Sequence, residues 1–158
     1  MDNNTYLSEI AELYAAEVLG EALANRWLEL ASDLDQKYKL GLFLQLESEA
    51  KVRLRPLLAR HGISLIEEAR HKSAGISEAE ELAGLPWVKA MATLAKLAVP
   101  YAQRFEALLK VAQPEDFPLV RFMVDHERSV SRIAERESAG EPAMAHELVV
   151  KLAHPIAR

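Results

Sequence analysis

Apolar residues recur along most of this chain at intervals of three and four positions, and no stretch alternates in the manner of a β-strand. This spacing is typical of amphipathic helices. We expect a first helix over residues 5–31 and a second from the turn at 32–35 to about residue 61, where Gly62 fits a helix end. Three more are expected over 86–112, 117–138 and 143–156.

Residues 63–85 differ from the rest of the chain, because their polarity is mixed and two glycines fall within 75–84. We expect a connection there with one or two short helical turns. Two helical hairpins joined by more than twenty residues are typical of a four-helix bundle with one long crossover. The predicted fold class is therefore all-α: a four-helix bundle with a long crossover between helices two and three and a short C-terminal helix, forming a single domain over 1–158.

The composition of the chain excludes several classes of function. The chain has 158 residues, a formal net charge of −5 and no cysteine. The negative charge gives no support for a nucleic-acid partner, and the lack of cysteine excludes disulfides, thiolate nucleophiles and iron–sulfur clusters. No apolar run approaches the roughly 18 residues of a membrane span, and the polar start of the chain does not resemble a signal peptide. We expect no membrane contact and a cytoplasmic location.

Three predicted helices carry acidic residues within their apolar faces. Advancing each residue by about 100° around the helix axis places Glu17 and Glu21 in the apolar sector of the first helix. The same construction places Glu47 on the inner face of the second helix and Glu127 on that of the fourth, with His126 at its edge. A carboxylate in an apolar interior is costly unless a cation partners it.

The heights of these residues along the helices agree. Glu21 lies about as far before the first turn as Glu47 lies after it, and Glu127 lies about twelve residues past the second turn, or about 18 Å at 1.5 Å per residue. We therefore expect the acidic side chains and His126 to converge near the middle of the helices, around a cation that relieves their repulsion.

With this pattern the chain resembles the ferritin-like superfamily of carboxylate-bridged di-metal bundles. That family supplies one Glu from each of two helices and a Glu-x-x-His from each of the other two. Glu17 or Glu21 matches the first-helix Glu, Glu47 matches the second-helix Glu, and Glu127 matches the fourth-helix Glu. The third helix has no matching Glu.

The histidine positions of the family motif differ in this chain. Ala50 and Val130 stand where the motif has histidine, and His126 supplies one nitrogen beside Glu127. The metal ligands that the resemblance implies are Glu17, Glu21, Glu47, His126 and Glu127. Such a set suits a hard or borderline divalent metal, and the resemblance implies iron or manganese and an oxidoreductase that acts with oxygen or peroxide.

Other interpretations stay open at the level of the sequence. Lys51 lies four residues after Glu47, so a buried network of Glu with Lys, Arg or His can take the place of a metal. The chain is then a non-catalytic bundle for dimerisation or partner binding. Exposure of the carboxylates at the surface or in a homodimer contact is a second alternative, and a carrier of a small apolar ligand beneath Pro100 is a third.

Overall fold

The computed structural model describes residues 2–157, and all of its regular elements are helices. They are α1 (Asn3–Leu30), α2 (Leu34–Arg60), α3 (Ala69–Ala83), α4 (Trp87–Leu109), α5 (Phe117–Ser138) and α6 (Ala143–Lys151). No strand occurs within residues 2–157. The prediction of an all-α chain is confirmed.

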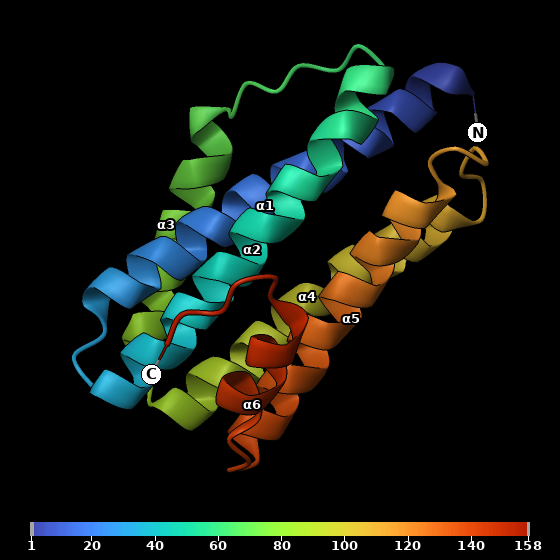
Figure 1. Cartoon of the computed structure of the whole chain (residues 1–158). Coiled ribbons are helices and arrows are strands. Elements are labelled where there is room, and N and C mark those ends of the chain that lie inside the picture. The colour runs from blue at the N-terminus through green and yellow to red at the C-terminus, as the bar shows by residue number, and fades with distance from the viewer. Residues whose placement is uncertain (1, 158) are drawn as a thin grey trace.

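The four long helices form two hairpins. α1 and α2 lie side by side and make the first hairpin, while α4 and α5 make the second (Figure 1). Pro56 and Pro100 lie inside α2 and α4, so neither proline ends its helix. α4 and α6 end earlier than the sequence predicts, at Leu109 and Lys151.

The connection between the hairpins contains a full helix, which corrects the prediction of one or two short turns. α3 has 15 residues and packs along α1 (Figure 1). Its contact is close at Gly75, where an added Cβ would overlap the backbone oxygen of Leu19. Gly75, Ala79 and Leu82 are the buried residues of α3. Because two of these three are small, the buried face of α3 has few of the large apolar residues that mark a core-facing helix in the sequence.

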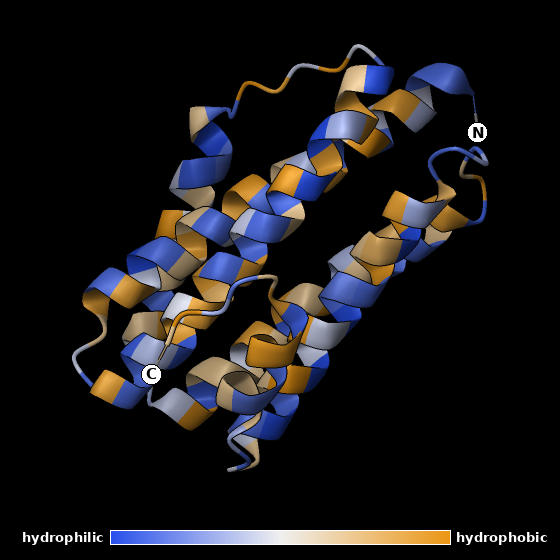
Figure 2. Ribbon diagram, viewed as in Figure 1, coloured by the Kyte–Doolittle hydropathy of each residue, from blue (hydrophilic) through white to orange (hydrophobic). Residues whose placement is uncertain are grey.

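The core consists of two apolar clusters, one towards each end of the hairpins. The α1 residues of the first cluster end at Val18, and those of the second begin at Leu23. On α2 the division falls between Leu46 and Leu54, and on α5 between 124 and 130. Figure 2 shows hydrophobic and hydrophilic residues interleaved along every helix, as amphipathic helices require. Three long helices therefore have a break in their apolar packing at a similar level.

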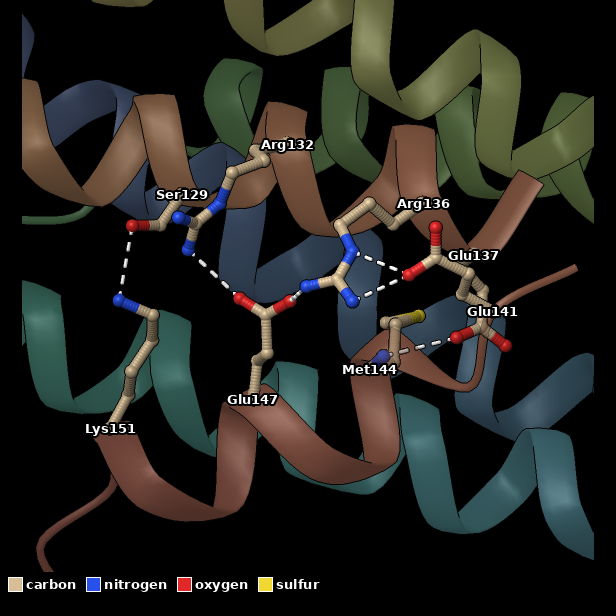
Figure 3. Close-up of polar contacts among 8 residues, drawn as sticks. All are labelled: Ser129, Arg132, Arg136, Glu137, Glu141, Met144, Glu147 and Lys151. Atoms are coloured by element: carbon tan, nitrogen blue, oxygen red, sulfur yellow. Dashed lines mark hydrogen bonds and ion pairs between the residues drawn. The ribbon is translucent and has the colours of Figure 1, made fainter. Parts of the chain in front are cut away.

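α6 is held against α5 by charged side chains (Figure 3). Glu147 on α6 accepts hydrogen bonds from Arg132, at 2.8 Å, and from Arg136. Lys151 Nζ lies 3.1 Å from Ser129 Oγ. The short C-terminal helix thus lies outside the hairpins, as the sequence predicts.

No helix among the described residues combines the length and the apolar character needed to cross a membrane.

Candidate metal centre

Carboxylates from α1 and α2 and an imidazole from α5 meet where the apolar core divides. Glu17, Glu47 and His126 are buried, with 1%, 5% and 6% of their surface exposed. His126 Nε2 lies 3.6 Å from Glu17 Oε2 and 3.4 Å from Glu47 Oε1. One ligand atom from each of the three lies within 4.8 Å of the other two. Carboxylate oxygens and an imidazole nitrogen at this spacing can hold a divalent cation.

The hairpin of α1 and α2 brings Glu17 and Glu47 to one level. Glu17 lies 13 residues before the end of α1 at Leu30, and Glu47 lies 13 residues after the start of α2 at Leu34. Both helices rise about 1.5 Å per residue, so the two side chains are equally far from the turn. The sequence predicts Glu21 opposite Glu47 at this level, and the structure places Glu17 there.

Gly20 makes room for the carboxylate of Glu47. A Cβ added to Gly20 would overlap Glu47 Oε2. The Glu47 carboxylate therefore lies directly against the backbone of α1, one helical turn from Glu17. A glycine inside a helix costs roughly 1 kcal/mol relative to alanine, and here its missing side chain sets the position of a candidate ligand.

Gly20→Ala will weaken metal binding at least about tenfold while α1 stays folded, because the new methyl group displaces Glu47 and alanine favours the helix. The displaced atoms are the end of a flexible side chain, so the fold can accommodate the change. Calorimetric titration with manganese(II) measures the affinity. Gly41→Ala is the matched control, since its Cβ would meet only the side chain of Ile156. Equal affinities of the two variants would contradict this role of Gly20.

Glu17 carries a buried polar atom that makes no hydrogen bond. Among the described residues, Glu17 Oε2 is the buried side-chain nitrogen or oxygen atom that makes no hydrogen bond. Leaving a buried polar atom unsatisfied costs about 1–3 kcal/mol. A cation bound between Glu17, Glu47 and His126 would give this oxygen a partner, so the residues present fit a metal ion.

The pKa values of the group show that it holds protons in the absence of a cation. Burial raises the pKa of Glu17 well above its ordinary value; His126 opposes the shift, and the charges of Glu47 and Glu127 add to it. Burial alone lowers the pKa of His126, but the carboxylates of Glu17 and Glu47 raise it to about 10. At neutral pH the imidazole is therefore protonated and partly compensates the carboxylates.

Glu127 lies beside the group of three. It is 8% exposed and, with Glu47 and Tyr101, lines a cavity of about 50 Å³. Burial raises the pKa of Glu127 to about 8, and within residues 2–157 no hydrogen bond reaches its carboxylate. Glu127 is thus a buried acid next to the candidate ligands, but it is not one of the three residues whose ligand atoms lie within 4.8 Å of one another.

Glu21 is separated from the group. Its carboxylate forms an ion pair with Lys51 and accepts a hydrogen bond of 2.6 Å from Ser48 Oγ. Lys51 also contacts Glu67 Oε1 at 2.7 Å, and only 7% of the Lys51 side chain is exposed. The cation that relieves the charge of Glu21 is therefore a lysine, and this lysine contacts Glu21 and Glu67 rather than Glu47.

Two acidic residues that were not among the predicted site residues lie near this region. Glu67 precedes α3, and its ion pairs with Lys51 and Lys72 lower its pKa to about 2. Glu78 lies on α3 and lines the same cavity as Glu127. The position of Glu78 depends on α3 packing against α1, so a correct prediction of α3 would have revealed it, whereas Glu67 lies in the loop before α3 and no helical period predicts its position.

No protein-family model, curated protein or solved structure matches this chain. The case for a metal centre therefore rests on the burial, spacing and chemistry of the residues themselves.

Proposed function

We propose that this chain is a ferritin-like metal-binding protein in which Glu17, Glu47 and His126 hold one divalent cation. The observation that carries the proposal is the buried Glu17 Oε2 atom, which has no hydrogen-bond partner and lies 3.6 Å from His126 Nε2. A cation would partner this oxygen and balance two buried carboxylates. Glu127 is the proposed additional ligand, since it is the nearest further buried acid on α5.

The arrangement of the long helices supports the ferritin-like assignment. Two hairpins joined by a long connection supply the candidate ligands from α1, α2 and α5, and bundles of this family place their ligands on facing helices. The chain departs from the family pattern because α4 contributes no carboxylate and His126 is the sole imidazole of the group. These departures favour one cation over the family's pair.

Two carboxylates and one imidazole suit iron(II) or manganese(II). Either ion, when bound, supplies one-electron chemistry with oxygen or peroxide, and oxidoreductase activity with these molecules is the proposed reaction class. Glu17 and Glu47 provide the negative charge that attracts the cation. His126 must give up its proton before Nε2 can bind a metal, so the affinity will increase as the pH rises towards the imidazole pKa of about 10.

Calorimetric titration of chelator-treated protein with manganese(II) tests the proposal. We expect about one equivalent to bind and at least one proton to leave, because His126 is protonated in the metal-free protein. Repeating the titration in two buffers with different ionisation enthalpies measures the proton release. Absence of binding at every pH at which the protein stays folded would contradict the proposed function.

A second candidate function is a non-catalytic helical protein in which His126 takes the place of the metal. The observation that favours it is the contact of His126 Nε2 with both Glu17 and Glu47, at 3.6 and 3.4 Å. A protonated imidazole there satisfies part of the buried charge and fixes the packing of α5 against α1 and α2. The manganese(II) titration separates the two candidate functions, because no manganese(II) should bind if His126 takes the place of the metal.

A further inference from the structure

A cleft on the outer side of α2 and α5 extends from the surface to His126. It has a volume of about 180 Å³, and its lining includes Arg53 from α2, Phe122 from α5 and the side chain of Lys151 from the end of α6. His126, of which only 3% of the side chain is exposed, lines its inner part. The cleft is distinct from the cavity that Glu127 lines, since the two have no lining residue in common.

Two basic side chains of this cleft have no carboxylate partner among the described residues. The guanidinium carbon of Arg53 lies 3.9 Å from the centre of the Phe122 ring, which is a cation–π contact. Lys151 Nζ contacts the hydroxyl of Ser129 at 3.1 Å. Two cations without a carboxylate partner beside one cleft can each bind an anionic group of a ligand.

The two acidic residues of the lining are already engaged. Glu49 Oε2 accepts a hydrogen bond of 3.1 Å from the backbone N–H of Ala153, and Asp125 Oδ2 lies 3.4 Å from Arg121 Nε. Among the described residues neither carboxylate pairs with Arg53 or Lys151, so both cations remain available to an anion.

The size and the apolar lining of the cleft restrict what can bind there. Leu46, Ala50 and Phe122 supply apolar surface, and the part of the cleft beside His126 holds about 180 Å³, less than the roughly 300–1,000 Å³ that drug-sized ligands occupy. Arg53 and Lys151 also line a wider neighbouring hollow of about 640 Å³. A compact organic molecule with one anionic group fits this combination. Arginine binds a carboxylate or a phosphate in a two-point contact, and the small volume of the cleft favours the smaller carboxylate as the anionic group.

We propose that this cleft is the binding site of a small organic carboxylate, held by Arg53 and Lys151, with its apolar part against Leu46, Ala50 and Phe122. Binding of the carboxylate depends on these residues alone. Its identification as a substrate or co-substrate rests on the proposed metal centre, because the cleft reaches that centre at His126.

Benzoate and its neutral analogue benzamide are the probes for this proposal. We expect chelator-treated protein to bind benzoate saturably in a calorimetric titration, and to bind benzamide at least about tenfold more weakly, since a hydrogen bond to a charged group is stronger than one to a neutral group. Arg53→Gln and Lys151→Gln will each weaken benzoate binding about tenfold. Arg55→Gln is the matched control, because Arg55 is exposed on the same helix and does not line the cleft.

Equal affinity for benzoate and benzamide, equal effects of Arg53→Gln and Arg55→Gln, or no saturation at millimolar concentrations would overturn the proposal. Thermal melting of each variant shows whether the fold is intact. Manganese(II) titration of the same protein separates the two proposals: metal binding without benzoate binding refutes the carboxylate site alone, and benzoate binding without metal binding refutes the metal centre alone.

Discussion

Chelator-treated protein will melt about 5–10 °C higher when manganese(II) is added at a hundred times its dissociation constant, and Glu17→Gln will abolish this increase. A ligand that binds only the folded state at that concentration stabilises it by about 2.7 kcal/mol. For a chain of 158 residues, each kcal/mol corresponds to about 2–4 °C. Calorimetric or fluorescence melting curves of both proteins, with and without metal, measure the effect.

The choice of glutamine makes the result specific. Burial raises the pKa of Glu17 well above its ordinary value, which favours the neutral form of this residue, and glutamine imitates that form in shape and charge. We therefore expect the metal-free melting temperature of Glu17→Gln to equal or slightly exceed that of the unchanged protein. A loss of metal binding then reports the missing carboxylate and not a disturbed fold.

Glu21→Gln is the control for this experiment. Glu21 lies on the same helix, one turn away, but its carboxylate contacts Lys51 and Ser48. We expect this variant to keep the metal-induced increase and to lose some metal-free stability, since the buried Lys51 loses one of its two charged partners. The proposed ligand set would be wrong if Glu17→Gln kept the increase or if Glu21→Gln lost it.

The sequence predicts the long helices well because each carries a broad apolar face. The predicted range 117–138 coincides with α5 (Phe117–Ser138), since a turn rich in proline precedes it and Ala139 and Gly140 follow it. α3 escapes prediction for a physical reason. Its packing on α1 depends on a glycine that permits close backbone approach, and tertiary contact of this kind leaves little hydrophobic pattern in the sequence.

The same contrast between long, regular helices and irregular segments explains which residues of the candidate site the sequence predicts. Helical phase predicts that Glu17, Glu47 and His126 face the same interior, because all three lie on long, regular helices, but comparison of heights paired Glu47 with Glu21 where the structure has Glu17. Glu21 differs because four residues on a helix turn a side chain by about 40°, which moves its carboxylate towards Lys51. The partner Glu67 lies in the loop before α3, and no helical period predicts where a loop residue lies.

Glu137→Ala will lower the free energy of unfolding by about 3 kcal/mol, because Lys39 keeps Asp35 but loses its buried carboxylate partner, and two N–H donors lose their acceptor. Glu137 is 4% exposed, and its Oε1 lies 2.6 Å from Lys39 Nζ and accepts a hydrogen bond of 3.2 Å from Trp87 Nε1. Its other oxygen accepts a hydrogen bond of 3.0 Å from the backbone N–H of Met144. One carboxylate thus joins α2, α4, α5 and the start of α6. Urea denaturation measures the loss, which corresponds to a melting temperature lower by about 6–12 °C.

Two further variants show whether the buried charge or the hydrogen bonds produce this effect. Glu137→Gln keeps an acceptor for the Met144 N–H but removes the charge that faces Lys39, so we expect a loss smaller than that of the alanine variant. Glu135→Ala, on the exposed side of the same helix, should change the free energy by no more than about 0.5 kcal/mol. If glutamine at 137 is as destabilising as alanine, the ion pair with Lys39 carries the stability. If Glu137→Ala matches Glu135→Ala, this carboxylate does not hold the four helices together.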